Sequence, residues 1–418
     1  MKKIIFLLTF LSSLNFQSLQ GQQWVVYNTF NSQIPSNGVL SIEIDSNNTK
    51  WIGTGAGLVR IKGNEWTIFD TTNSPLSRSV ILSLALEGKE ILWIGTSNAL
   101  YRFDGLNWTK YDTTNSNIPK GTIWNILVKD HIKWICTTLG GLGKFNDTVW
   151  TVYNTLNSGL TENWVECIAI DTNNIKWIGM HTKGMFKYND TSWVNFNTSN
   201  SPIRTSVVNI NVDKSNRKWI SDGYLKIFKD SDSSWFFFDS SNSNFNFINN
   251  TETLFPNDSL VWMSTLGYGV YKYNYNTWIN YNENNSGLPN NSNRIIRIDK
   301  QNNKWIATSV GGLAVFNENG VVIIENNNSV INNFELKQNY PNPFNPVTNI
   351  EFSITRKEKL RLTVYDINGK AIKNLINSIL ETGSYKVQWN VENYPSGIYF
   401  CKLETSNSAI TIKMVLIK

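Results

Sequence analysis

Residues 206–238 read SVVNINVDKSNRKWISDGYLKIFKDSDSSWFFF, and this stretch contains one complete unit of the repeat that decides the fold. Apolar and polar residues alternate through 206–213, as in a half-buried strand, and further apolar segments lie at Trp219, 225–228 and Trp235. Asn, Asp, Ser and Gly, which favour turns, separate these segments. The unit therefore predicts four short strands in about 42 residues.

Two series of tryptophans carry this repeat along the chain. Successive members of each series lie 41 to 43 residues apart, and together they account for fourteen of the 17 tryptophans. Seven four-stranded units at this period predict an all-β fold that begins with a seven-bladed β-propeller. The series are Trp51, Trp93, Trp134, Trp177, Trp219, Trp262 and Trp305, and Trp24, Trp66, Trp108, Trp150, Trp193, Trp235 and Trp278.

The ends of the repeat indicate how the ring of blades closes. Residues 24–27 form an outer-type strand with no inner strands before it, whereas the seventh unit, 294–316, lacks its outer tryptophan. Strand 24–27 could complete that unit, and so could the apolar segment 321–324. Both alternatives remain open from the sequence.

The first residues are typical of an export leader. Lys2 and Lys3 precede the apolar run 4–11, which predicts a signal peptide over residues 1–21. The run is too short to cross a bilayer, so we expect no transmembrane segment in the mature chain. The propeller is expected over residues 22–325.

The last part of the chain differs in composition from the repeats. A polar linker at 326–334 leads into residues 335–418, where alternating strands and turn residues predict a small antiparallel β-sandwich of immunoglobulin-like form. We expect its strands at 348–354, 360–365, 384–389, 397–403 and 409–417, with Trp389 in the core.

Two stretches in the repeats resemble the two-component regulator propellers. They are Asp171-Thr-Asn-Asn-Ile-Lys-Trp-Ile-Gly179 and Lys133-Trp-Ile-Cys-Thr-Thr-Leu-Gly-Gly-Leu142. The resemblance covers about residues 24–325 and implies a propeller fold with a tendency to bind ligands. It does not extend to signal transduction, because the chain has no kinase or receiver segment.

The C-terminal module carries a second resemblance, on Gln338-Asn-Tyr-Pro-Asn-Pro-Phe-Asn-Pro346, Val364-Tyr-Asp-Ile-Asn-Gly369, Ser396-Gly-Ile-Tyr399 and Lys413-Met-Val-Leu-Ile-Lys418. These motifs are similar to the type A sorting domains of the type IX secretion system. The resemblance implies passage through the periplasm, recognition by the secretion machinery, and a protein that is secreted or held on the outer cell surface. Whether it is released or anchored is left open.

The net charge of +6 argues against nucleic acid as a partner. The leader and the residues from 335 onward supply all of it, so the propeller is neutral and has no phosphate-tracking surface. The three cysteines do not have metal-ligand spacing, and a bond between Cys136 and Cys167 is conceivable.

Groups for catalysis are scarce. His131 and His181 are the only histidines, and the sequence has no metal motif, phosphate loop or nucleophile triad, so we predict no cofactor and no enzymatic activity. We interpret His131 as a turn residue. Asp45, Asp171, Asp213 and Asp299 recur with the repeat, which favours turn formation over catalysis.

Five residues are candidates for a ligand-binding face. Trp124 and Trp164 fall outside both tryptophan series, and we expect them in equivalent neighbourhoods at the start of the innermost strands of blades three and four. Exposed indole rings there could stack on a sugar, or they could plug the channel. The full set is Trp124, Trp164, Glu166, His181 and Lys183.

These features predict an exported binding or interaction module whose ligand is a glycan or a protein. The alternative is a secreted propeller enzyme, such as a polysaccharide lyase or hydrolase. The ligand's identity and the oligomeric state are not determined by the sequence.

Overall fold

The computed structural model describes residues 23–76, 80–243, 251–256, 259–321, 334–354, 357–381, 383–405 and 409–418. Within these residues all regular secondary structure is β-strand. The chain divides into two compact units, residues 1–325 and 326–418. The predicted signal peptide and linker residues 326–333 lie outside the described part.

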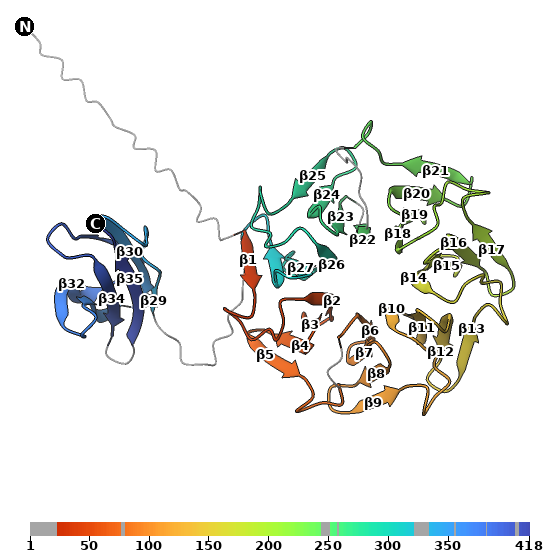
Figure 1. The fold of residues 1–418 in the computed structure, drawn as a ribbon, viewed down its shortest axis with the longest axis horizontal. Helices are drawn as coiled ribbons and strands as arrows, with labels where there is room; N and C mark the ends of the chain where they lie inside the picture. The colour runs from red at the N-terminus through yellow and green to blue at the C-terminus, as the bar shows by residue number, and fades with distance from the viewer. Residues whose placement is uncertain are drawn as a thin grey trace, which may run out of the picture. The chain divides into compact units, whose positions relative to one another are not determined.

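The first unit is a seven-bladed propeller, as predicted (Figure 1). Each blade is a four-stranded antiparallel sheet. The innermost strands are β2 (Val39–Ile44), β6 (Ser83–Glu87), β10 (Ile123–Lys129), β14 (Val165–Ile170), β18 (Asn209–Val212), β22 (Thr251–Pro256) and β26 (Asn293–Ile298). The second strands are β3 (Lys50–Thr54), β7 (Ile91–Gly95), β11 (Ile132–Thr137), β15 (Lys176–Met180), β19 (Lys218–Ser221), β23 (Val261–Thr265) and β27 (Lys304–Thr308).

The outer half of each blade follows the same order. The third strands are β4 (Gly57–Lys62), β8 (Leu100–Phe103), β12 (Leu142–Phe145), β16 (Met185–Tyr188), β20 (Leu225–Lys229), β24 (Val270–Tyr273) and β28 (Leu313–Phe316). The outermost strands are β5 (Glu65–Phe69), β9 (Trp108–Tyr111), β13 (Trp150–Tyr153), β17 (Trp193–Phe196), β21 (Ser234–Phe237), β25 (Trp278–Tyr281) and, for the seventh blade, β1 (Trp24–Tyr27).

Strand β1 closes the ring, which selects the first of the two closure alternatives. It pairs antiparallel with β28, so that Trp24 lies opposite Phe316. Backbone N–H of Asn317 donates to the carbonyl of Gln23 at 2.9 Å and extends this contact. Residues 322–324 of the competing segment lie outside the described part.

The tryptophans pack as the repeat requires. First-series indoles lie on the second strands and are buried between neighbouring blades; Trp134, for example, packs against the fourth blade's Val165 and Phe186. Second-series indoles lie on the outermost strands. In six blades each stacks on the opposite aromatic ring of the third strand, with centroids 4.0 to 4.5 Å apart. The core of the propeller is therefore a set of radial layers between blades.

A polar contact joins many of these layers. In four blades a carboxylate six residues before the buried tryptophan accepts its indole N–H at 2.8 to 3.0 Å; the pairs are Glu87–Trp93, Asp171–Trp177, Asp213–Trp219 and Asp299–Trp305. The next blade's lysine joins three of these carboxylates: Lys133 to Glu87 at 3.4 Å, Lys218 to Asp171 at 3.0 Å and Lys50 to Asp299 at 3.3 Å. The contact from Lys50 ties the first blade to the seventh.

The recurring aspartates also form turns, as predicted. Oδ1 of Asp171 accepts the N–H groups of Asn173 and Ile175, and Oδ1 of Asp45 accepts those of Asn47 and Thr49. His131 is likewise a turn residue, with φ of 60° in the left-handed region.

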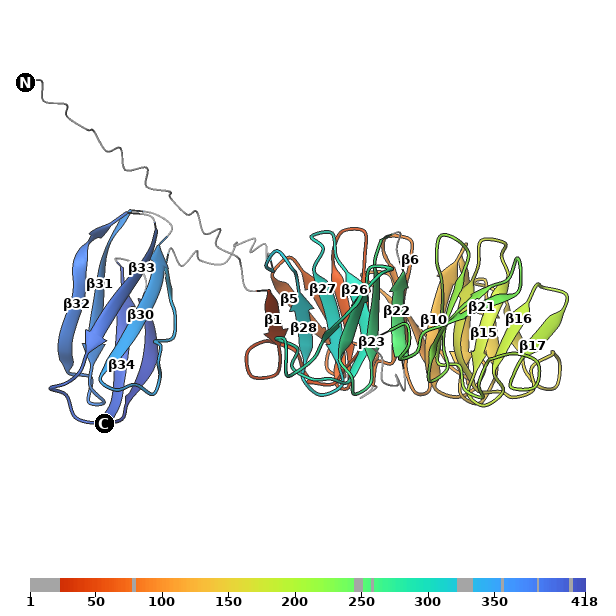
Figure 2. The same ribbon diagram turned by 90° about the horizontal axis from the view of Figure 1, so that it is seen from above.

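The alternating strand directions give the propeller two distinct faces. Figure 2 shows the blades edge-on, with strands running between these faces. We call one the crossover face, since it carries the links between blades and the turns between second and third strands. The other is the hairpin face, which carries the remaining turns. The three cysteines are buried and free, so Cys136 and Cys167 form no disulfide.

The second unit is the predicted β-sandwich. One sheet contains β29 (Phe334–Leu336), β30 (Val347–Ile354) and β33 (Gly383–Asn390). The other contains β32 (Ala371–Leu380), β31 (Glu358–Tyr365), β34 (Gly397–Glu404) and β35 (Ala409–Leu416). Trp389 lies in the core between the sheets, as expected, whereas β32 was not among the strands expected from the sequence.

Candidate functional site

The innermost strands carry an extra residue near their start. In β2, β10, β14, β22 and β26 the pairing register shifts there; leaving β22 aside, the unpaired residues are Leu40, Trp124, Glu166 and Arg294. A bulge of this kind re-aims a side chain away from the regular ladder. The four positions follow the period of the repeat, so their side chains belong to one level of the channel.

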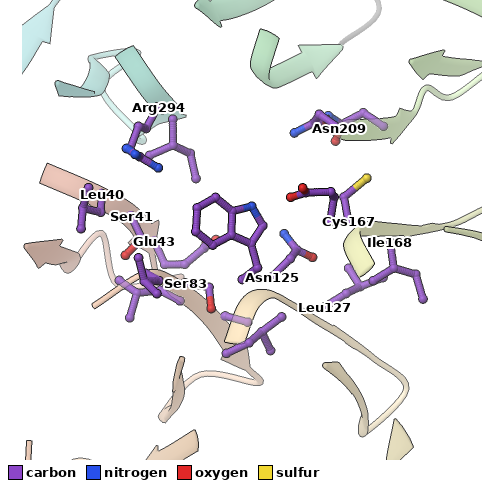
Figure 3. Close-up of a pocket in the computed structure, with 18 of the residues that line it drawn as sticks. Leu40, Ser41, Glu43, Ser83, Asn125, Leu127, Cys167, Ile168, Asn209 and Arg294 are labelled. Atoms are coloured by element: carbon purple, nitrogen blue, oxygen red, sulfur yellow. The ribbon is translucent and has the colours of Figure 1, made fainter. Parts of the chain in front are cut away.

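The channel contains a cavity of 420 Å³ at this level, and all four bulged residues line it. Figure 3 shows the cavity with Arg294, Asn209 and Asn125 contributed by different blades. The wall therefore combines an indole, a carboxylate, a guanidinium group and side-chain amides. At this level the first two blades contribute the apolar side chains of Leu40 and Leu82.

An ion pair also lines the channel, further along the innermost strands. Nη2 of Arg297 donates to Oε1 of Glu43 at 2.7 Å and Nε donates to the same atom at 3.2 Å, which joins the seventh blade to the first. Both side chains are 20% exposed, so the pair faces the cavity while its charges compensate each other.

Three of the predicted site residues form a cluster on the crossover face. The rings of Trp164 and His181 are stacked, with centroids 3.7 Å apart and an interplanar angle of 8°. Nδ1 of His181 lies 2.7 Å from Oε1 of Glu166. The backbone N–H of His181 donates to the carbonyl of Trp164 at 3.2 Å. Glu166 therefore contacts this cluster and also lines the cavity.

The environment of Glu166 alters its acidity. Its side chain is 7% exposed, and burial raises the pKa of the carboxyl group above its usual value, while the hydrogen bond from His181 opposes this increase. Indole Nε1 of Trp164 is shielded from solvent and has no acceptor among the described residues. The cluster thus holds a carboxyl group that is easier to protonate than usual and an unused donor.

Glu162 fixes the loop beside this cluster. Its carboxylate accepts the backbone N–H groups of Thr182 and Lys183 at 2.6 and 2.8 Å, and the hydroxyl of Thr182 at 2.8 Å. Lys183 is exposed on this loop. The loop therefore holds the backbone next to His181 in a defined conformation.

The expected equivalence of Trp124 and Trp164 is wrong. Trp124 is the bulged residue of β10, and the bulged residue of β14 is Glu166, so Trp164 stands two positions earlier. Trp164 corresponds instead to Thr122. The carbonyl of Thr122 accepts the backbone N–H of Thr138, just as the carbonyl of Trp164 accepts the backbone N–H of His181. Both indoles are half-buried rather than fully exposed.

Sequence reasoning missed Arg294 and the Glu43–Arg297 pair. The signal was available, because residues 40, 82, 124, 166 and 294 follow the period of the repeat at or directly before the start of the first strand of their blades. The structure describes no group of three or more His, Cys, Asp or Glu side chains placed to hold a metal ion.

A comparison with protein families identifies the second unit. The family model described as a secretion system C-terminal sorting domain matches residues 338–418. Residues 338–418 are a secretion system C-terminal sorting domain. The sorting domain assigns the protein to type IX export, which delivers it to the cell surface or beyond. A search of curated proteins finds no match to this chain.

Solved structures confirm the propeller fold. The extracellular domain of the hybrid two-component system BT3049 from B. thetaiotaomicron is 18% identical with a TM-score of 0.61, and the match covers 94% of this chain but only 57% of that one. Virginiamycin B lyase from Staphylococcus aureus is 12% identical with a TM-score of 0.57, covering 70% and 98%. YCF48 from Cyanidioschyzon merolae is 13% identical with a TM-score of 0.54, covering 72% and 100%. At these identities the likeness concerns the fold.

No helix in the described residues is both long and apolar enough to cross a membrane.

Proposed function

We propose that the propeller is the binding module of this exported protein and that a glycan occupies the channel cavity. The observation that carries the proposal is the cavity wall, where Trp124, Glu166 and Arg294 come from three different blades. A sugar presents an apolar ring face that stacks on an indole, and hydroxyl groups that suit charged and amide partners. The cavity volume of 420 Å³ lies in the usual range for small-molecule sites.

The cluster of Trp164, His181 and Glu166 extends this site onto the crossover face. Glu166 is shared between the cavity and the cluster, so a ligand that reaches from the channel contacts both. Lys183 stands at the edge of this surface. A protein segment is the alternative ligand, since a solved structure of YCF48, a propeller of similar fold, contains a bound D1 peptide.

A glycan array probed with the full chain tests the proposal. Trp124→Ala is expected to weaken binding of the captured glycan by about 1–3 kcal/mol, roughly five- to 150-fold, because one stacking anchor is lost. Val149→Ala, at an exposed side chain outside the cavity lining, is the control and should leave binding nearly unchanged. Equal affinity of the Trp124→Ala variant and the unmodified chain would refute the assignment.

A second candidate function follows from the geometry of His181. Its Nδ1 contacts a carboxylate, an arrangement that leaves Nε2 available as a proton acceptor. Virginiamycin B lyase has a similar fold, so this fold is compatible with lyase activity. Incubation with a polysaccharide panel distinguishes the two functions: an enzyme produces unsaturated or shortened products that disappear in a His181→Ala variant, whereas a binding module leaves the chains intact.

A further inference from the structure

The junction of blades one and two lacks a contact that recurs around the ring. At five junctions a lysine directly precedes the first-series tryptophan, and its ammonium group lies 4.8 to 5.7 Å from the indole ring of the previous blade. These lysines are Lys50, Lys133, Lys176, Lys218 and Lys304. Leu92 stands in their place at the junction with blade one.

Blade five shows what happens when the lysine is replaced. Val261 stands in the lysine position of the next blade, and Arg217 of blade five supplies the cation instead. Its guanidinium group lies 5.9 Å from the Trp219 ring, and its Nε lies 2.7 Å from Oδ2 of Asp213. In blade one the residue that corresponds to Arg217 is Thr49, which carries no charge.

Trp51 therefore has one cation fewer than comparable indoles. In blades three, four and six the indole is approached by a cation of its own third strand and by the lysine of the next blade. Trp51 has the first kind of contact, with the guanidinium group of Arg60 at 5.9 Å. Among the described residues no second cation lies over the Trp51 ring, and the uncharged Leu92 stands at this junction instead.

A cavity of 330 Å³ occupies this junction on the hairpin face. Trp51 and Asp45 line it, together with the apolar side chains of Leu86, Leu92 and Leu106. Oδ1 of Asp45 is used by the turn, but among the described residues no hydrogen bond or ion pair reaches Oδ2. The other charged residues in the lining are Arg60, Lys62, Lys89, Glu90 and Asp104.

We propose that this cavity binds a primary alkylammonium group, such as a lysine side chain. The ammonium takes the position that the interblade lysine holds at the other junctions, over the indole of Trp51 and against Oδ2 of Asp45. The alkyl stem runs along Leu86 and Leu92, as a lysine stem covers apolar surface elsewhere. This site is distinct from the glycan cavity: the two linings share Leu86, but Trp51 and Asp45 line only this cavity, and Trp124, Glu166 and Arg294 line only the other.

Calorimetric titration of the full chain with Nα-acetyl-lysine methylamide tests the proposal, with the norleucine analogue as the uncharged control. The lysine compound is expected to bind at least about tenfold more tightly, because it alone makes the cation–π and charge-assisted contacts. Equal binding, or none by either compound, would overturn the proposal. Cadaverine distinguishes the two sources of the group: tighter binding of cadaverine assigns a free diamine, and tighter binding of the lysine compound assigns a polypeptide.

Two substitutions, Leu92→Lys and Asp45→Asn, test whether the ligand binds at this junction, and a third is a control. In Leu92→Lys the ammonium group of the protein's own lysine occupies the ligand position. The variant should therefore no longer bind the lysine compound, and its Tm should be higher. Val261→Lys is the matched control: Arg217 already contacts Asp213 there, so binding should persist and the Tm should not rise. Asp45→Asn preserves the turn acceptor and should weaken binding about tenfold. Unchanged binding in both the Leu92→Lys and Asp45→Asn variants contradicts the assignment.

Discussion

The propeller and the sorting domain are both built from antiparallel strands, yet their functional information is distributed differently. In the propeller each buried tryptophan recurs in every blade and serves the packing between sheets. In the sorting domain Trp389 lies in one core between two sheets, and the motifs that identify the domain cover nearly its whole length. In a repeat protein, residues at the regular positions therefore stabilise the fold. In such a protein the candidates for function are the residues that depart from the repeat, such as Trp124, Arg294 and Leu92.

The largest expected effect is on the localisation of the protein, and it depends on the sorting domain alone. Deleting residues 335–418 removes the sorting domain, so the protein should accumulate in the periplasm of its host instead of reaching the surface or the medium. The propeller should still fold, because each unit has its own core. Cell fractionation and a thermal melt of the truncated protein measure both results. Normal surface delivery of the truncated protein would disprove the export role.

The next prediction concerns the closure of the ring. Removing residues 22–30 deletes β1, together with the stacking of Trp24 on Phe316 at 4.5 Å. Losing a packed tryptophan costs about 3–5 kcal/mol, so the propeller should melt at a markedly lower temperature. The sorting domain should keep its own transition. If the melting curve were unchanged, another segment would have to complete the seventh blade.

The architecture could be predicted in detail because the tryptophans mark it twice in each blade. Period and alternation determine which strands exist and where the indoles pack. Register within the innermost strands was not predictable in the same way, because a bulge adds one residue without changing the apolar pattern around it. The bulges of β10 and β14 are equivalent, so the wrong pairing of Trp164 with Trp124 has another cause: these two residues lie 40 positions apart, two fewer than the 42 between Trp124 and Glu166. Strand β32 was missed because its residues are mostly exposed or half-buried and do not alternate regularly.

The candidate site combines residues that the sequence singled out with others that it did not. Trp164, Glu166 and His181 meet because the loop before β14 and the turn after β15 lie on the same face, a consequence of blade topology that can be deduced from strand order. Arg294 was missed because an arginine on a strand is usually a surface residue, and only its alignment with residues 40, 124 and 166 marks it. The contacts between Lys50 and Asp299, on opposite sides of the ring closure, depend on tertiary geometry that no local pattern contains.

A smaller effect distinguishes the two tryptophans that the sequence treated alike. Trp164→Ala removes the stacking on His181 and should reduce the free energy of unfolding by about 1–3 kcal/mol. Trp124→Ala should change it less, since its half-buried ring borders a cavity, and should act mainly on ligand binding. Urea unfolding of both variants measures the difference. Equal destabilisation by about 3–5 kcal/mol would instead indicate that both indoles plug the channel.

The smallest expected effect concerns the pH dependence of stability at Glu166. Burial raises the pKa of this carboxyl group in the folded protein above its ordinary value of 4.5. The folded state therefore binds the proton more tightly than the unfolded chain, so the contribution of Glu166 to stability decreases as the pH rises from the ordinary value through the raised one. Above that window the contribution is constant. The neighbours that modulate it are His181, which lowers the pKa, and Glu162, which raises it.

Glu166→Gln isolates this contribution, because glutamine keeps an oxygen for the hydrogen bond to Nδ1 of His181 but has no proton to lose. The variant should match the unmodified protein near pH 4 and become relatively more stable as the pH rises toward 7. Urea midpoints at several pH values measure this trend. If the variant instead became less stable than the unmodified protein as the pH rose, folding would favour the carboxylate form of Glu166. In that case His181, rather than burial, would dominate the environment of Glu166.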